Sequence, residues 1–437
     1  MSENTYHQTS SEREKAFLVA VDTGADSGWG AEESLRELAA LVETAGGEVV
    51  GTVSQNRDSI HPLWYMGSGK AEELKQLKEQ THFSILVADD ELSPRQQRSL
   101  EKLLDVKVLD RSGVILDIFA QRAHTHEGRI QVELAQLEYQ LPRLTRLWTH
   151  LSRTGGGIGT RGPGETQLET DRRVIRERVK KTRERVEEVR RRRETAARNR
   201  DRRLLPTVAI VGYTNAGKST LLNALVGSEA ALAEDKLFAT LDPTTRRVNL
   251  GEGQNVIVSD TVGFIHKLPH QLVDAFRATL EEVSRADALV EVVDLSDIRA
   301  AEHRQTVMTV LDELGAGHKP RVLVLNKSDA VPLGYVPPSG VVKRDDLHVV
   351  RVSANEGLGL DELRTQLVEA LADLWVPVDL RLPYSAGELL ARVRERGSVI
   401  FEYEDEDVRV KGHVPPAIMD ELTSSARAWR RAAESDS

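Results

Sequence analysis

The feature that most constrains this chain is a glycine-rich loop between an expected strand and an expected helix. The apolar run at residues 207–211 leads into Gly212-Tyr-Thr-Asn-Ala-Gly217-Lys218-Ser219, and the helix-forming run TLLNALVG follows. This matches G-x-x-x-x-G-K-[ST] in the strand–loop–helix context that the motif requires. Further apolar runs at 256–260, 288–293, 321–325 and 349–352 predict more strands, so we expect an α/β domain over about 205–372.

The loop is expected to hold the phosphates of a nucleotide. Its glycines let backbone N–H groups turn inward, and the following helix adds its positive N-terminal end. Lys218 would supply a charge to the β and γ phosphates, and Ser219 a hydroxyl to Mg²⁺. A second glycine–lysine turn, Gly67–Lys70, lacks the first glycine and is better interpreted as a helix N-terminus. The phosphate-site candidates are Gly212, Tyr213, Thr214, Asn215, Ala216, Gly217, Lys218 and Ser219.

Two further motifs follow strands and indicate that the base is guanine. Asn326-Lys327-Ser328-Asp329 comes after the run VLVL, and a carboxylate there accepts hydrogen bonds from the guanine N1–H and exocyclic amine. Adenine offers neither donor on that edge, so a buried site of this kind rejects it. The tripeptide Ser353, Ala354 and Asn355 follows the next strand and would close over the base.

Between these motifs lie candidates for sensing the γ-phosphate and the metal. Asp260 would hold a water of the Mg²⁺ shell, and the Gly263 N–H would contact the γ-phosphate, with Thr261 and Val262 between them. Upstream, Phe238, Ala239, Thr240, Leu241 and Asp242 form a segment in which a threonine hydroxyl can bind Mg²⁺ only while the γ-phosphate is present. Thr244 and Thr245 compete with Thr240 for that role.

The chain lacks a catalytic residue that many GTPases use to orient the attacking water. The position after D-x-x-G holds Phe264, which cannot orient water as a glutamine does. The chemistry would then depend on the metal, the backbone and a group from a large partner, with slow intrinsic hydrolysis. The alternative is that His266 or Gln271 takes over within the chain. Asn215 could help to coordinate a monovalent cation such as K⁺, or it could brace the loop.

Outside the nucleotide domain, the patterns predict further parts. Residues 1–15 form a polar extension, expected to be disordered, and 16–123 alternate strands (16–22, 48–53, 84–88) with helices, as in an α/β domain. Over 124–203, apolar seams from Ile130 and from Ile175 predict an antiparallel helical hairpin with a Gly-rich tip at 154–165. Residues 375–430 predict a small α+β domain, and 431–437 a disordered tail.

Charge and composition limit the kinds of partner that the chain is expected to bind. The formal net charge is −10, yet residues 171–203 carry 16 Lys/Arg against 7 Asp/Glu. One basic segment in an acidic chain favours a specific polyanion contact, although a solvated helix face explains the interspersed acids. The chain has no cysteine, which fits a reducing compartment, and no apolar run long enough to span a membrane.

Taken together, these motifs resemble those of the HflX family of GTPases. The resemblance rests on Asp117–Ala123 (DIFAQRA), Gln131–Leu137 (QVELAQL), Gly162–Glu169 (GPGETQLE) and Phe238–Arg246 (FATLDPTTR). It implies a monomeric cytoplasmic GTPase that binds GTP or GDP at the motifs above and takes Mg²⁺ at Ser219 and Thr240. Lys218, Thr240 and Gly263 are then the expected catalytic residues. It also implies a large-ribosomal-subunit and rRNA partner, on which family members separate the subunits of stalled or idle ribosomes.

Two other functions stay open at this point. The chain could be an RNA-binding or ribosome-assembly module in which GTP only sets a conformation and no splitting occurs. An ATP-driven RNA remodeller working through the first domain is a weaker alternative, because the Gly67–Lys70 turn is incomplete.

Overall fold

The computed structural model describes residues 13–24, 29–144, 163–200, 205–227, 237–238, 244–251, 254–267, 277–404, 407–414 and 416–435. The chain divides into two compact units: residues 1–185 with 267–275, and residues 186–266 with 276–437. The long helix α6 (Pro163–Arg200) crosses from the first unit to the second. Within the described residues, no helix is both long and apolar enough to cross a bilayer.

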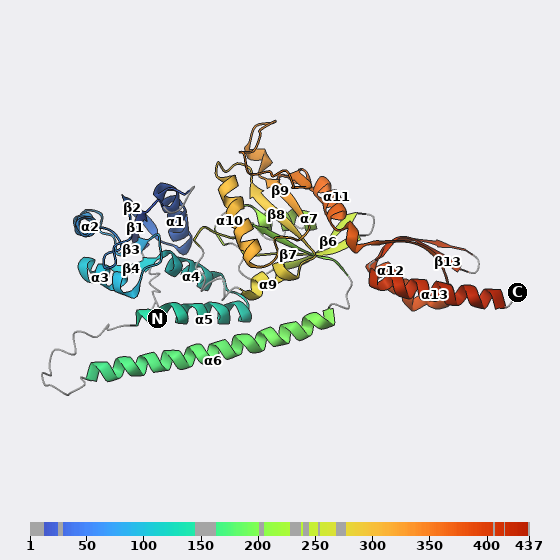
Figure 1. Ribbon diagram of the computed structural model, residues 1–437, viewed down its shortest axis with the longest axis horizontal. Helices are drawn as coiled ribbons and strands as arrows, with labels where there is room; N and C mark the ends of the chain where they lie inside the picture. The colour runs from blue at the N-terminus through green and yellow to red at the C-terminus, as the bar shows by residue number, and fades with distance from the viewer. Residues whose placement is uncertain are drawn as a thin grey trace, which may run out of the picture. The chain divides into compact units, whose positions relative to one another are not determined.

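The first unit contains a parallel four-stranded sheet in the order β2-β1-β3-β4. Helices α1 and α4 cover one face and α2 and α3 the other (Figure 1). Its strands are β1 (Lys15–Asp22), β2 (Glu48–Asn56), β3 (Ile85–Ala88) and β4 (Lys107–Asp110), and its helices are α1 (Ala31–Ala45), α2 (Ser68–Thr81), α3 (Pro94–Leu104) and α4 (Arg111–Arg122). The sequence patterns missed β4 because its four residues KVLD carry only two buried side chains. The core is built from side chains such as Val19, Leu74, Leu86 and Val108.

Two helices follow the sheet, α5 (His126–Arg143) and the first part of α6. Ion pairs join them, Arg178 to Glu133 and Arg183 to Glu138, each at 2.6 Å. Val179 and Thr182 of α6 are buried, as the seam at that spacing predicts. Most of the Gly-rich tip lies outside the described residues, so the antiparallel hairpin stays a prediction.

The second unit contains a six-stranded sheet in the order β10-β9-β8-β5-β7-β6. All neighbours are parallel except β6 and β7, which confirms a mixed, mostly parallel sheet. Helices α7 and α11 pack on one face and α10 on the other. The elements are β5 (Thr207–Gly212), α7 (Lys218–Val226), β6 (Thr244–Gly251), β7 (Gln254–Asp260), α9 (Arg277–Arg285), β8 (Ala288–Asp294), α10 (Ala300–Glu313), β9 (Arg321–Asn326), β10 (His348–Arg351) and α11 (Leu360–Ala370).

The edge strand β6 was not foreseen from the sequence. Its residues TTRRVNLG bury only Val248 and Leu250, because one side of an edge strand faces solvent. Thr244 and Thr245, the two competitors for the metal-binding threonine, stand in this strand and pair with Asp260 and Ser259. Thr240 itself, together with Ala239, Leu241 and Asp242, lies outside the described residues.

The C-terminal part is an antiparallel three-stranded sheet, β11-β13-β12, with two helices. Val378, Leu382, Val393, Val410 and Leu422 form its core. The elements are β11 (Val376–Pro383), α12 (Gly387–Arg396), β12 (Ser398–Tyr403), β13 (Asp407–Val414) and α13 (Pro416–Ser435). Helix α13 continues into the segment expected to be a disordered tail, and its last turns (ARAWRRAAES) are rich in the helix formers Ala, Arg and Glu.

Candidate nucleotide-binding site

The predicted motifs meet at one edge of the six-stranded sheet, because each follows the carboxyl end of a parallel strand. The phosphate loop follows β5, Asp260 ends β7, Asn326 ends β9 and Ser353 comes just after β10. Strand β5 lies at the point where the strand order reverses, between β8 and β7. In sheets of this kind ligands bind outside the carboxyl ends at that point. The topology therefore gathers residues from four separate stretches into one site.

The two loop glycines are needed for close approach. A Cβ on Gly212 would lie 2.3 Å from the Val292 carbonyl oxygen of the neighbouring strand β8. A Cβ on Gly217, whose φ is +90°, would lie 2.3 Å from the Asn326 amide nitrogen. Any larger residue at either position would push the loop away from the strand that it packs against.

A single buried amide joins the phosphate loop to the base motifs. The Asn326 side chain is 2% exposed. Its Nδ2 donates to the Ala216 carbonyl at 2.8 Å, and its Oδ1 accepts from the Ala354 N–H at 3.1 Å. Asn326 thus fixes the spacing between the loop expected to hold the phosphates and the tripeptide expected to hold the base. Asp329 stays exposed nearby, with its carboxylate open to a ligand.

The metal candidates fit Mg²⁺ by their chemistry. Ser219 Oγ donates to Asp260 Oδ2 at 2.6 Å, so a hydroxyl and a carboxylate converge at the start of α7. Hard oxygen donors of this kind, completed by phosphate oxygens and water, are what Mg²⁺ takes in nucleotide sites. Thr261 anchors the same segment, since its hydroxyl donates to the Ile210 carbonyl at 2.6 Å.

The segment after Asp260 pairs with the phosphate loop through its backbone. The Phe264 N–H donates to the Gly212 carbonyl at 3.1 Å, and the Phe264 carbonyl accepts from the Thr214 N–H at 2.8 Å. The Phe264 ring is only 2% exposed. The residue that occupies the usual glutamine position is therefore a packing residue.

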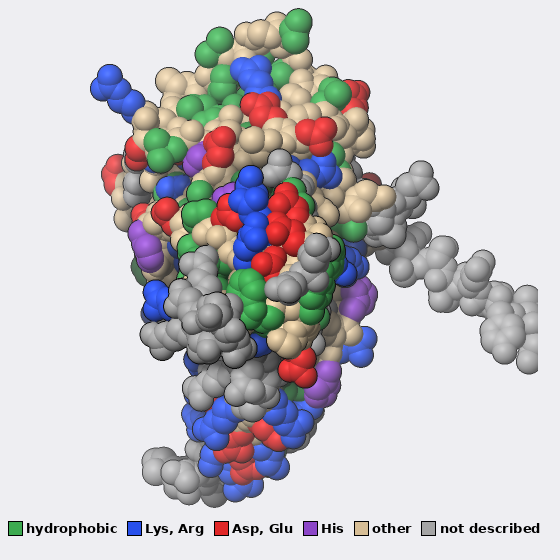
Figure 2. Space-filling model, turned by 90° about the vertical axis from the view of Figure 1, so that its right-hand side faces the viewer, with side chains coloured by type: hydrophobic (Ala, Val, Ile, Leu, Met, Phe, Trp, Pro, Cys, Tyr) green, Lys and Arg blue, Asp and Glu red, His purple; other side chains and the backbone are tan. Residues whose placement is uncertain are grey.

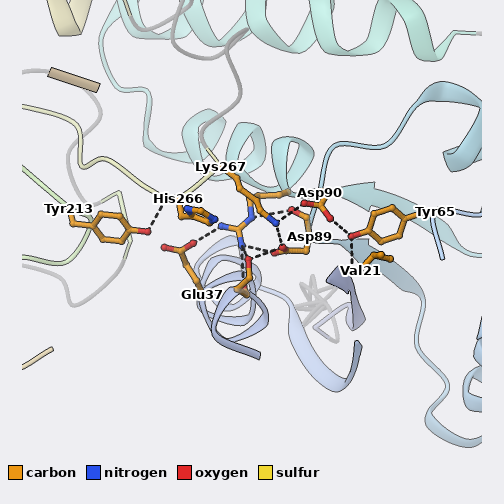
Figure 3. A network of polar contacts seen from close by, with 10 residues as sticks. Val21, Glu37, Tyr65, Asp89, Asp90, Tyr213, His266 and Lys267 are labelled. Atoms are coloured by element: carbon orange, nitrogen blue, oxygen red, sulfur yellow. Dashed lines mark hydrogen bonds and ion pairs between the residues drawn. The ribbon is translucent and has the colours of Figure 1, made fainter. Parts of the chain in front are cut away.

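Tyr213 makes contacts that sequence reasoning did not foresee. Its hydroxyl accepts from the His266 N–H at 2.8 Å (Figure 3). Its ring stacks on His303 of α10, with centroids 3.9 Å apart and planes 7° apart. Tyr213 was expected only as a member of the phosphate loop. No sequence spacing connects it to His303, which lies 90 residues further along.

Lys218 is buried and lies over its own loop. Its Nζ donates to the Tyr213 carbonyl at 2.8 Å. Burial lowers the pKa of this ammonium to about 8, although the Asp260 carboxylate opposes the shift. Phosphates bound beside it would favour the charged form and raise the pKa again.

Nucleotide binding should therefore weaken above neutral pH. Below pH 8 the lysine is already charged, whereas above it binding must take up a proton. With a free-state pKa of about 8, the affinity for GDP should be ~4-fold lower at pH 8.5 than at pH 7. Titration with fluorescent GDP at each of these two pH values measures the change in affinity. A Lys218→Met variant should bind weakly with no such pH dependence, and an equal dependence in that variant would contradict the assignment.

Known proteins share these features over most of the chain. Three family models match in succession: "GTP-binding GTPase N-terminal" over residues 32–120, "GTP-binding GTPase Middle Region" over 122–200 and "50S ribosome-binding GTPase" over 207–327. A relative from Lacrimispora saccharolytica named GTPase HflX is 47% identical over 419 residues, covering 95% of this chain and 97% of its own length.

A second relative and a solved structure also match much of the chain. The GTPase HflX of Escherichia coli K12 is 43% identical over 399 residues and covers 91% of each chain. Among solved structures, a GTP-binding protein from the archaeon Sulfolobus solfataricus in complex with GDP is 25% identical. That match covers 82% of this chain and 99% of the archaeal one, with a TM-score of 0.43.

Proposed function

The chain belongs to the HflX family of GTPases, and we propose that it is a slow GTPase that the large ribosomal subunit activates and that separates the subunits of stalled or idle ribosomes. Its relatives and its GTPase domain make the chain a GTP hydrolase of the 50S-binding GTPase family. The steps beyond that, activation and splitting, are the proposal. They would take place in the cytoplasm, with the protein acting as a monomer.

The proposal that a partner activates hydrolysis rests on the burial and backbone pairing of Phe264. Its ring is buried and its backbone is paired with the phosphate loop, so it offers no polar group to an attacking water. The His266 backbone N–H donates to the Tyr213 hydroxyl, a bond that does not involve the imidazole, and Gln271 lies outside the described residues, so these two residues stay the alternative within the chain. A group supplied by a partner would complete the site, as an arginine finger does in other GTPases.

We assign the nucleotide contacts to the same residues that the sequence singled out. Gly212–Ser219 would hold the phosphates, Asp329 the guanine edge and Ser353–Asn355 the far side of the base. Ser219 and Asp260 would hold Mg²⁺ directly and through water, and Thr240 would join them when the γ-phosphate is present. Once bound, the metal would neutralise charge on the β and γ phosphates.

Asn215 supports a role for a monovalent cation within this proposal. The Asn215 backbone is left-handed, with φ of +60°, and its side chain is exposed. Within the described part of the chain its amide has no hydrogen bond that would brace the loop. We propose that it helps to coordinate K⁺ next to the phosphates. Hydrolysis should then be faster in potassium than in sodium chloride, and Asn215→Ala should remove the difference.

Helix α6 supplies a surface suited to ribosomal RNA. Arg178, Arg183, Arg191 and Arg192 keep 62–77% of their side chains exposed. Arginines and glutamates alternate on this helix at the foot of the view in Figure 2. Guanidinium groups bind phosphate bidentately, so the exposed arginines support an rRNA contact despite the acids between them.

The proposal is tested by GTP turnover with and without purified large ribosomal subunits. We expect stimulation of at least about a hundredfold for GTP and none for ATP. Light scattering of joined ribosomes, followed after addition of the protein and GTP, tests the splitting step. Stimulation with unchanged scattering would indicate an assembly or RNA-binding module instead. Absence of stimulation would leave the GTPase assignment intact and would rule out the large subunit as the source of the missing group.

A further inference from the structure

The sheet of the first unit has its own crevice at the position where α/β sheets bind ligands. In the order β2-β1-β3-β4, the chain passes from β1 to β2 on one side of β1 and then returns to β3 on the other side. The strand order therefore reverses between β1 and β3. A cavity of about 50 Å³ opens there at the carboxyl ends of the two strands. We call it the acidic crevice, since its polar lining includes Asp22, Ser34, Asp89 and Asp90.

A lysine from a distant part of the sequence also lines the acidic crevice. Lys267 Nζ lies 2.8 Å from Asp89 Oδ2 and 2.6 Å from Asp90 Oδ1 (Figure 3). By its contacts this residue belongs to the first unit, although the chain immediately before it belongs to the second. In the sequence it stands four residues after Gly263, the expected γ-phosphate contact.

The two carboxylates are held in place by buried groups. Arg111, 1% exposed, donates to Asp89 Oδ1 at 2.6 Å, and Ser34 Oγ donates to Asp89 Oδ2 at 2.7 Å. The Tyr65 hydroxyl donates to Asp90 Oδ2 at 2.5 Å. Asp89 Oδ2, which accepts from both Ser34 and Lys267, and Asp90 Oδ1 are directed at the Lys267 ammonium, so the geometry is that of a built cation site.

The carboxylates of this cluster outnumber its arginine. Arg111 also pairs with Glu37 at 2.6 Å, so one guanidinium pairs with the carboxylates of Glu37 and Asp89, and Asp90 adds a third carboxylate to the crevice. Burial opposes ionisation of Asp89, but Arg111 and Lys267 outweigh it and hold its pKa at about 2. The Lys267 ammonium thus offsets part of the negative charge that lines the crevice.

The lysine is also tied to the nucleotide motifs through the chain. Its neighbour His266 bonds to Tyr213 of the phosphate loop, and Phe264 pairs with Gly212 and Thr214. Lys267 itself has a left-handed backbone, with φ of +55°, which a non-glycine residue adopts only when its surroundings hold it there. A shift of Gly263 toward a γ-phosphate would reach Lys267 across three residues of short, anchored chain.

We propose that the acidic crevice is an intramolecular binding site for the Lys267 ammonium, occupied without nucleotide or with GDP and vacated when GTP binds. The dependence on nucleotide rests on the proposed function, whereas the site itself does not. Because linkage is reciprocal, whatever energy holds Lys267 in the crevice is subtracted from the binding of GTP. GDP, which lacks the γ-phosphate, binds without disturbing it.

Carbodiimide cross-linking of the full chain tests the site directly, since it joins an amine to a carboxylate only when the two are in contact. We expect linked peptides between Lys267 and Asp89 or Asp90 in the free and GDP-bound protein. A non-hydrolysable GTP analogue should lower their yield at least about fivefold. If the analogue binds but the yield is unchanged, the coupling is wrong. If no linked peptide forms in any state, the site itself is wrong.

Nucleotide affinities of variants provide the second test. Lys267→Ala and Asp90→Asn should each bind the GTP analogue about fivefold tighter with unchanged GDP affinity, and the double variant should add nothing further. Lys267→Arg keeps the positive charge, so its affinity for the GTP analogue should stay close to that of the unchanged protein. The matched control is Lys70→Ala, because Lys70 pairs with Glu73 at 2.9 Å in the same unit and its side chain has the same 24% exposure. Equal changes for GTP analogue and GDP, or additive effects, would overturn the proposal.

Discussion

Replacing Asp329 by asparagine should exchange the base that the protein recognises. The carboxylate is expected to accept two hydrogen bonds from guanine, each contributing about 1.5–3 kcal/mol to a charged acceptor. Losing about 4 kcal/mol weakens GTP binding roughly a thousandfold. Xanthine carries an oxygen where guanine carries its amine, so an asparagine amide can donate to that oxygen and accept from N1–H.

Competition titrations with GTP, GDP, ATP and XTP measure the exchange. The asparagine variant should bind XTP more tightly than GTP, a gain that an unfolded protein could not show. Asp345→Asn, the same change at an exposed aspartate outside the motif, is the control and should change GTP affinity by less than about threefold. If Asp329→Asn retained its preference for GTP, the base would be read elsewhere, and the assignment of Asn326–Asp329 would be wrong.

The positions in the fold that could be predicted from the sequence are those of residues whose spacing the proposed ligand would fix. Gly212, Gly217 and Lys218 stand at set intervals because a phosphate must meet several N–H groups and one ammonium at once. Asp260 and Asn326 follow apolar strands, and parallel strands deliver their carboxyl ends to the same edge. Local pattern and global topology therefore point to the same place.

The contacts that were missed have no local pattern. Lys267 and Asp89 are separated by 178 residues, and nothing in the run FIHKLP marks its lysine as the ligand of a distant sheet. The acidic pair after SILVA was a faint signal, since it ends a strand as the other site residues do. The stack of Tyr213 on His303 depends on how α10 packs, which propensity and periodicity do not describe.

The second large effect is expected at Asn326. Replacing it by alanine removes the bonds to the Ala216 carbonyl and the Ala354 N–H and leaves both groups buried. Each unsatisfied group costs about 1–3 kcal/mol, so the unfolding free energy should fall by roughly 2–6 kcal/mol. The phosphate loop and the base-binding tripeptide also lose their fixed spacing, and we expect about a hundredfold weaker binding of GTP and GDP alike.

Denaturant unfolding without nucleotide and titration with GDP separate the two effects. Asn326→Asp keeps the acceptor for Ala354 but places an oxygen against the Ala216 carbonyl, so it should damage the phosphate loop while sparing the base side. Asn249→Ala is the control for losing an asparagine in this unit, because the Asn249 side chain is exposed near the end of β6, where it accepts from the Gly251 N–H. Unchanged affinity in Asn326→Ala would mean that nucleotide binding itself reorganises both loops. The preformed spacing seen here would then contribute little to recognition.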